Sequence, residues 1–148
     1  MATGIAGTGD IVDAHVTFWI RTGRFPGAMM LKGIAGGALG KRAMEGGAGT
    51  AAMGLFFHFF ISFAFTLLFF LLYPRVGALR KNRFAVGTAY ALFTWAVMNY
   101  IVWPLSALPW RPPSFADWHL YMDWAVFTIV FGLPIVFCAA RFYRRQQG

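Results

Sequence analysis

The sequence predicts an all-α integral membrane bundle of four transmembrane helices, with a short interfacial helix between the first two. Two observations support this fold class. Of the 148 residues, 59% are hydrophobic and 12% are charged, whereas about a quarter of the residues in a soluble domain are charged. Seven of the thirteen lysines and arginines stand in two clusters beside the ends of long apolar runs, in residues 75–83 and 141–145. Transmembrane helices are typically flanked in this way, and the length fits one domain, residues 1–148.

Three apolar runs are long enough to cross a bilayer, which takes about 20 residues. They cover residues 48–73, 84–104 and 119–142. Pro104 ends the second run and Pro134 interrupts the third. A helix in a membrane tolerates such a proline with a kink, because neighbouring helices satisfy the freed carbonyl group.

The first candidate span, residues 3–20, is more polar because it contains Asp10 and Asp13. Each carboxylate would raise the free energy of membrane insertion by about 2.5–3.5 kcal/mol at the centre of a transmembrane helix. The segment can span if other helices cover its polar face, and the alternative is a peripheral segment with three spans in total. In the following segment, residues 26–44, Pro26 suits the first turn of a helix and the pattern predicts a short interfacial helix.

Four stretches carry a resemblance to a known family. They are GIAGTGDIVDA (4–14), GIAGGALGKRAMEGGAGTAAMGLFFHF (33–59), MNYIVWPLSALPWRPPSF (98–115) and FGLPIVFCAARF (131–142). In this order they resemble the YagU-like proteins, which are small bacterial inner-membrane proteins. The resemblance spans nearly the whole chain and implies a compact four-helix membrane protein. It implies no established activity and assigns a role to no residue.

Small and polar residues recur every three or four positions along the 48–73 run. Such residues lie on one face of a helix, where they allow close approach and hydrogen bonds between membrane helices. The sequence therefore predicts a helix-packing stripe made of Gly47, Ala51, Gly54, His58, Ser62 and Thr66.

A second set of polar residues is predicted to form a buried cluster. With antiparallel neighbouring spans, its members fall in the same half of the membrane, and ionisable residues inside a membrane are candidates for a functional site. We expect the acids to be neutral or hydrogen-bonded to histidines, hydroxyls or amides. His119 and Asp123 are four residues apart and can touch on the same side of a helix. The cluster comprises Asp10, Asp13, His15, His58, Asn99, His119 and Asp123.

Several kinds of site find little support in the sequence. The single cysteine, Cys138, excludes an internal disulfide. No HExxH-type spacing or nucleophile motif is present, so we expect no metal site and no catalytic residue. No cofactor is required, although His15 and His58 could in principle face a haem or pigment. The basic residues flank spans instead of forming a basic domain, which argues against nucleic-acid binding.

Two functions remain open. The first is a non-catalytic accessory or assembly subunit that packs against other membrane protein subunits, since eight phenylalanines lie between Leu55 and Leu72. The alternative is a small proton- or cation-handling transporter or channel-like protein that uses the buried Asp and His residues. The transporter requires a hydrated cavity that reaches Asp10 or Asp13, whereas the accessory subunit requires a dry, closed bundle. We expect a multi-pass protein of the bacterial inner membrane with both termini in the cytoplasm, because the two tight basic clusters favour that side.

Overall fold

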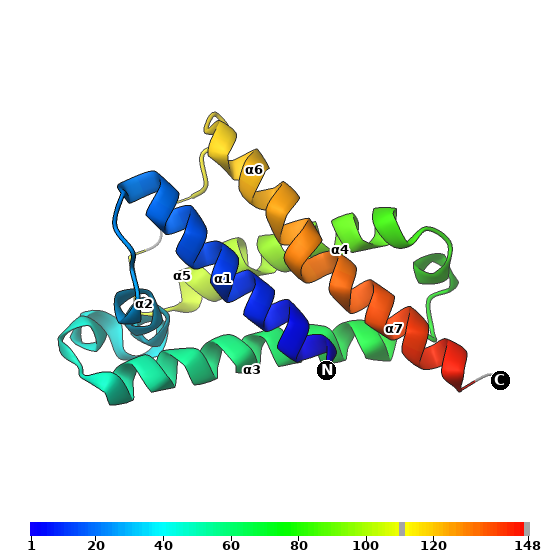
Figure 1. Cartoon of the computed structure of the whole chain (residues 1–148), viewed down its shortest axis with the longest axis horizontal. Coiled ribbons are helices and arrows are strands. Elements are labelled where there is room, and N and C mark those ends of the chain that lie inside the picture. Colours follow the sequence, from blue (N-terminus) through cyan, green and yellow to red (C-terminus); the bar gives the residue numbers. More distant parts are fainter. Residues whose placement is uncertain (110–111, 147–148) are drawn as a thin grey trace.

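The structure is a computed structural model of the chain, and it describes residues 1–109 and 112–146. The described residues form helices and connecting loops, with no strand among them, so the all-helical character is confirmed. The main helices are α1 (Ala2–Thr22), α2 (Ala28–Leu39), α3 (Ala48–Leu72), α4 (Arg83–Val97), α6 (Trp118–Phe127) and α7 (Leu133–Arg145) (Figure 1). Two 3₁₀ turns, η1 (Gly40–Glu45) and η2 (Gly77–Arg80), lie in the connections that follow α2 and α3.

Three of the helical stretches are long and apolar enough to cross a membrane: Ala48–Leu72, Arg83–Leu105 and Trp118–Arg145. They coincide with the three apolar runs of the sequence. The second stretch joins α4 to the short α5 (Trp103–Leu105), and the third joins α6 to α7. The first candidate span is also a helix, the 21-residue α1, but it is not one of these three.

Each of the two composite helices contains a π-helical turn just before a proline. η3 (Met98–Val102) precedes Pro104, and η4 (Thr128–Gly132) precedes Pro134. In these turns the N–H of Trp103 donates to the carbonyl of Met98, and that of Leu133 donates to Thr128, five residues back in each case. Because proline has no N–H to donate, an interrupted hydrogen-bond ladder is expected at these places. The helices continue through both turns.

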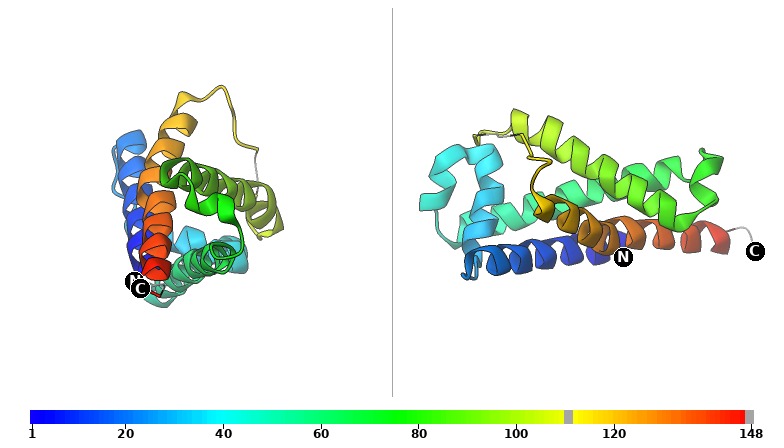
Figure 2. Two further views of the ribbon diagram at one scale, coloured as in Figure 1. Left: turned by 90° about the vertical axis from the view of Figure 1, so that its right-hand side faces the viewer. Right: turned by 90° about the horizontal axis from the view of Figure 1, so that it is seen from above.

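The long helices run alongside one another, and α2 crosses α3 (Figures 1 and 2). α1 packs on α3 and along the whole α6–η4–α7 helix. The buried core lies where α3, α4 and α7 meet and includes the ring of Phe69 and the side chains of Ile135 and Val136, all 0% exposed. Ala6 of α1 joins the same core.

Glycines permit the closest helix crossings. A Cβ added to Gly54 of α3 would overlap the carbonyl group of Leu31 in α2. A Cβ added to Gly9 of α1 would lie 2.9 Å from the carbonyl oxygen of Val130 in η4. Val130 is four residues before Pro134, so its carbonyl receives no α-helical hydrogen bond from that position. The crossing of α1 with η4 therefore requires a residue without a side chain at Gly9.

Candidate functional site

The predicted helix-packing stripe lies on the inner face of α3, except at its first residue. Ala51, Gly54, Ser62 and Thr66 are buried. Gly47 is exposed, because it precedes the helix as an extended N-cap residue and so does not continue the helical face. Thr66 donates its hydroxyl hydrogen to the Ser62 carbonyl within the same helix.

His58 joins this stripe to α1. Its Nε2 lies 2.7 Å from the carbonyl oxygen of Gly7. Since a carbonyl oxygen only accepts hydrogen bonds, Nε2 carries the proton and donates it. The other ring nitrogen, Nδ1, faces Asp10 of α1 with 3.9 Å between Nδ1 and Oδ2. The His58 side chain is 10% exposed and that of Asp10 is 30% exposed.

The bond to Gly7 restricts how His58 and Asp10 can share protons. With Nε2 protonated, a neutral His58 presents a lone pair at Nδ1, and an ionised Asp10 presents lone pairs as well. The two groups attract each other when one proton resides on either of them, as an imidazolium with a carboxylate or as an imidazole with a carboxylic acid. Both arrangements are neutral overall, which suits a low-dielectric position.

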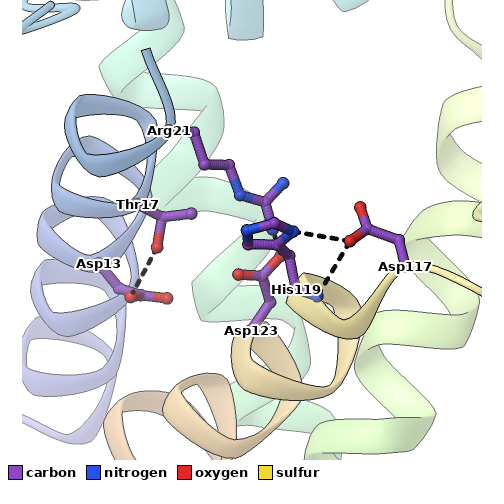
Figure 3. Close-up of polar contacts among 6 residues, drawn as sticks. All are labelled: Asp13, Thr17, Arg21, Asp117, His119 and Asp123. Atoms are coloured by element: carbon purple, nitrogen blue, oxygen red, sulfur yellow. Dashed lines mark hydrogen bonds and ion pairs between the residues drawn. The ribbon is translucent and has the colours of Figure 1, made fainter. Parts of the chain in front are cut away.

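The other acid of α1, Asp13, contacts its own helix. The Thr17 hydroxyl donates to Asp13 Oδ1 at 3.4 Å, a contact between residues four apart (Figure 3). One turn further along, Arg21 donates to Asp123 of α6 at 2.7 Å, with both side chains 37% exposed. The sequence did not predict this ion pair, because the first candidate span was taken to end at residue 20, one residue before Arg21. The spacing of Asp13, Thr17 and Arg21, four residues each, would have placed all three on one face if the helix had been extended to Thr22.

His119 and Asp123, which helical spacing allows to touch, each contact another residue. His119 instead lies 2.7 Å from Asp117 through its Nδ1, and its backbone N–H donates to the same carboxylate oxygen at 3.0 Å (Figure 3). Asp117 is the N-cap residue of α6, so it satisfies a free N–H group at the start of the helix. The hydrogen bonds from the His119 ring and backbone lower the pKa of the Asp117 carboxyl.

Two members of the predicted cluster make different contacts. His15 of α1 points both ring nitrogens at backbone carbonyls, with Nδ1 2.7 Å from Ile11 O and Nε2 3.3 Å from Gly27 O. Asn99 lies in η3 and donates its amide N–H to the Trp95 carbonyl at 2.9 Å. The contacts of the predicted cluster are thus distributed along α1 and its interface with α3, in η3 and at the start of α6.

Two cavities lie between the helices. A groove of about 330 Å³ between α1, α2 and α3 is lined by apolar side chains and His15, and a smaller cavity of about 70 Å³ lies between α4 and α6. Asp10 and Asp13 line neither of them. Across residues 1–109 and 112–146, no three His, Cys, Asp or Glu side chains are grouped so that they could hold a metal ion.

Comparison of the chain with protein-family models, with curated proteins and with solved structures finds no match. The resemblance to YagU-like proteins therefore stays an expectation. The fold and the contacts above define an all-helical protein with three helices that can cross a membrane and a more polar helix packed against two of them.

Proposed function

We propose that this chain is a small non-catalytic accessory or assembly subunit of the bacterial inner membrane, which packs against a larger membrane complex through the outer face of α3. In this proposal α1 is a fourth span and α2 lies at the membrane interface. Contacts of Asp10 with His58 and of Asp13 with Thr17 support the fourth span, because they reduce the cost of placing acids in a membrane. The crosswise position of α2 supports the interfacial helix (Figure 2).

The observation that carries the proposal is an exposed aromatic stripe on α3. Phe56, Phe60 and Phe63 are 63%, 59% and 51% exposed, and the rings of Phe56 and Phe60 stack at 6.0 Å. The spacing of four and three residues puts these rings on one face, opposite the helix-packing stripe. Met53, Leu67 and Leu71 extend this outer stripe, and all three are exposed. Large aromatic side chains in alternating steps of three and four residues suit packing against another helix.

The interior supports a packing role over a catalytic one. The described cavities are apolar or small, and the acids of α1 are turned toward His58 and Thr17. A bundle of this kind offers its outer surface as the main means of interaction.

Site-specific photo-crosslinking in intact membranes tests the proposal. Benzoylphenylalanine replaces Phe60 in one variant and Phe93 in the matched control, because Phe93 is an exposed phenylalanine of α4. We expect one discrete protein adduct from position 60 and none from position 93. Phe56→Leu together with Phe63→Leu should weaken that adduct, since these changes keep the helix apolar but remove the neighbouring rings. Lipid adducts alone at position 60 would contradict the proposal.

A second candidate function is proton or cation handling, and the His58–Asp10 pair favours it. The two side chains come from different helices and face each other with 3.9 Å between Nδ1 and Oδ2, and neighbouring Asp and His side chains are a common element of proton relays. Purified protein in liposomes containing a pH-sensitive dye should then carry protons, and Asp10→Asn should abolish the flux while Asp117→Asn leaves it unchanged. Absence of wild-type flux would remove this candidate.

The proposal places both termini in the cytoplasm. The C terminus lies at the same end of the molecule as the loop that follows α3, and the N terminus lies between that end and the middle of the molecule (Figure 1). In a Cys138→Ala background, cysteines introduced at Asn82 and Gln146 should resist an impermeant thiol reagent in intact cells and react after lysis. Labelling of either position from outside would reverse the orientation.

A further inference from the structure

The charges of the chain are unevenly distributed between its two ends. Seven basic residues lie at the end formed by the α3–α4 connection and the last turns of α7, and no acid lies in residues 73–83 or 141–146. All five acids of the sequence lie in α1, in η1 or around the start of α6. We call the first of these regions the basic end, and its charged residues are Arg75, Arg80, Lys81, Arg83, Arg141, Arg144 and Arg145.

Aromatic contacts join the two segments of the basic end into one surface. The rings of Tyr73, just after α3, and Tyr143 of α7 stack at 5.5 Å. The Tyr143 hydroxyl donates to the Phe70 carbonyl at 2.8 Å. The Arg83 guanidinium lies over the ring of Phe137 in α7, at 5.7 Å. The α3–α4 connection and the end of α7 therefore present their charges together.

These charges are available to an external anion. All seven basic residues are exposed, and within the described residues none forms an ion pair with a carboxylate. Arg75 donates to the Leu71 carbonyl and Arg80 donates to the Pro74 carbonyl. A guanidinium has five N–H groups, so each of these arginines keeps donors for another acceptor.

We propose that the basic end binds the headgroups of anionic phospholipids in the adjacent leaflet. It lies where the apolar helices α3, α4 and α7 begin or end, at the depth where lipid phosphates would be found if these helices span a bilayer. Arginine matches a phosphate with paired hydrogen bonds, and tyrosines favour the same interfacial depth. Seven like charges repel one another, and lipid phosphates relieve this repulsion. The proposal is independent of whether α3 docks on another protein.

Lipid retention tests the proposal on the full chain. Wild-type protein is reconstituted in nanodiscs of phosphatidylglycerol and phosphatidylcholine in equal amounts, transferred to mild detergent and examined by native mass spectrometry. The test variant combines Lys81→Gln, Arg144→Gln and Arg145→Gln. The control combines Arg24→Gln, Lys41→Gln and Arg42→Gln, which removes the same charge from exposed residues outside the basic end.

We expect the wild-type protein to retain several-fold more phosphatidylglycerol than phosphatidylcholine. The test variant should lose most of this excess and the control should keep it, while the helical circular dichroism of both matches the wild type. Raised salt should reduce the excess, because screening weakens exposed charge interactions. Equal retention of the two lipids by the wild type, or an equal loss in the control, would overturn the proposal. Displacement of the lipid by inorganic phosphate or an oligonucleotide, beyond the loss that sodium chloride causes at the same ionic strength, would also overturn it, in favour of that soluble anion.

Discussion

α1 and α3 have similar lengths, 21 and 25 residues, and pack against each other, but they have very different side chains. α3 carries one titratable group, His58, among aromatic and aliphatic residues. α1 carries Asp10, Asp13, His15 and Arg21. Two of these groups meet a residue from a later helix: Asp10 meets His58, and Arg21 meets Asp123. α1 therefore depends on its neighbours, whereas α3 is apolar enough to enter a membrane without them.

This contrast suggests an order of assembly. Helices that are stable alone in a bilayer associate in a second stage through packing and hydrogen bonds. We expect α3, α4 and the α6–α7 helix to provide the frame, and α1 to be held by contacts with that frame. Changes at the contacts of α1 should then weaken the bundle more than similar changes on its free face.

The largest effect is expected from Gly9→Leu. The added side chain would meet the backbone carbonyl of Val130, which cannot move away as a flexible side chain could. Overpacking of this kind costs about 1–3 kcal/mol or more, measured as the free energy of unfolding in mixed micelles. Gly4→Leu is the matched control on the same helix, because a Cβ at Gly4 has no neighbour within 4 Å. Equal losses from the two changes would show that α1 does not pack as described.

A smaller effect is expected from His58→Leu. The change removes the hydrogen bond to the Gly7 carbonyl but adds apolar surface. The free energy of unfolding should therefore fall by about 1–2 kcal/mol, the range for such hydrogen bonds in membranes.

A double-mutant cycle measures the interaction between His58 and Asp10, and it needs Asp10→Asn alone and combined with His58→Leu. A coupling of about 0.6 kcal/mol or more between the two positions is expected. Strict additivity would mean that Asp10 and His58 do not interact.

The ion pair between Arg21 and Asp123 should contribute less to the free energy of unfolding than the His58 hydrogen bond, because both side chains are 37% exposed. Exposed pairs are worth about 0.2–1 kcal/mol. Arg21→Asp and Asp123→Arg should each destabilise the protein by bringing like charges together, and the combined exchange should restore most of the loss in thermal unfolding. Failure of the double variant to recover would indicate that the pair is incidental to the contact between α1 and α6.

The smallest effect is expected from Asp117→Asn, outside the three membrane-length helices. The lowered pKa of Asp117 means that its contribution to stability is present above the ordinary carboxyl value of 3.8 and is lost as pH falls through the folded-state value. Asparagine keeps the helix cap but not the charge. The variant should therefore melt slightly below the wild type at neutral pH, and the difference should vanish in strong acid. Asp117→Ala, which also removes the cap, should remain less stable at both pH values.

The apolar helices could be predicted from the sequence within a few residues, because their positions follow from run length alone. The expected 84–104 run is the helix Arg83–Leu105, and the expected 48–73 run is Ala48–Leu72. The partners of the polar residues could not be predicted in the same way. Arg21 and Asp123 are 102 positions apart, and their contact depends on how α1 lies across α6. Helical spacing allows His119 to touch Asp123 four residues later, but His119 contacts the N-cap carboxylate of Asp117, which is two residues before it.

The π turn η4 sets the rotational phase between the two halves of the last helix. Asp123 and Ile135 are 12 residues apart, which separates their directions by about 120° around a regular α-helix. With one extra residue absorbed in the wide turn, the effective step is eleven residues and the separation falls to about 20°. This agrees with Asp123 binding Arg21 of α1 while Ile135 lies in the core that contains Ala6 of α1. Deleting a single residue from Thr128–Gly132 would therefore give a regular α-helix that keeps Ile135, Val136 and Ala139 on the core face. Deleting a second residue would turn them away from the core by about 100°.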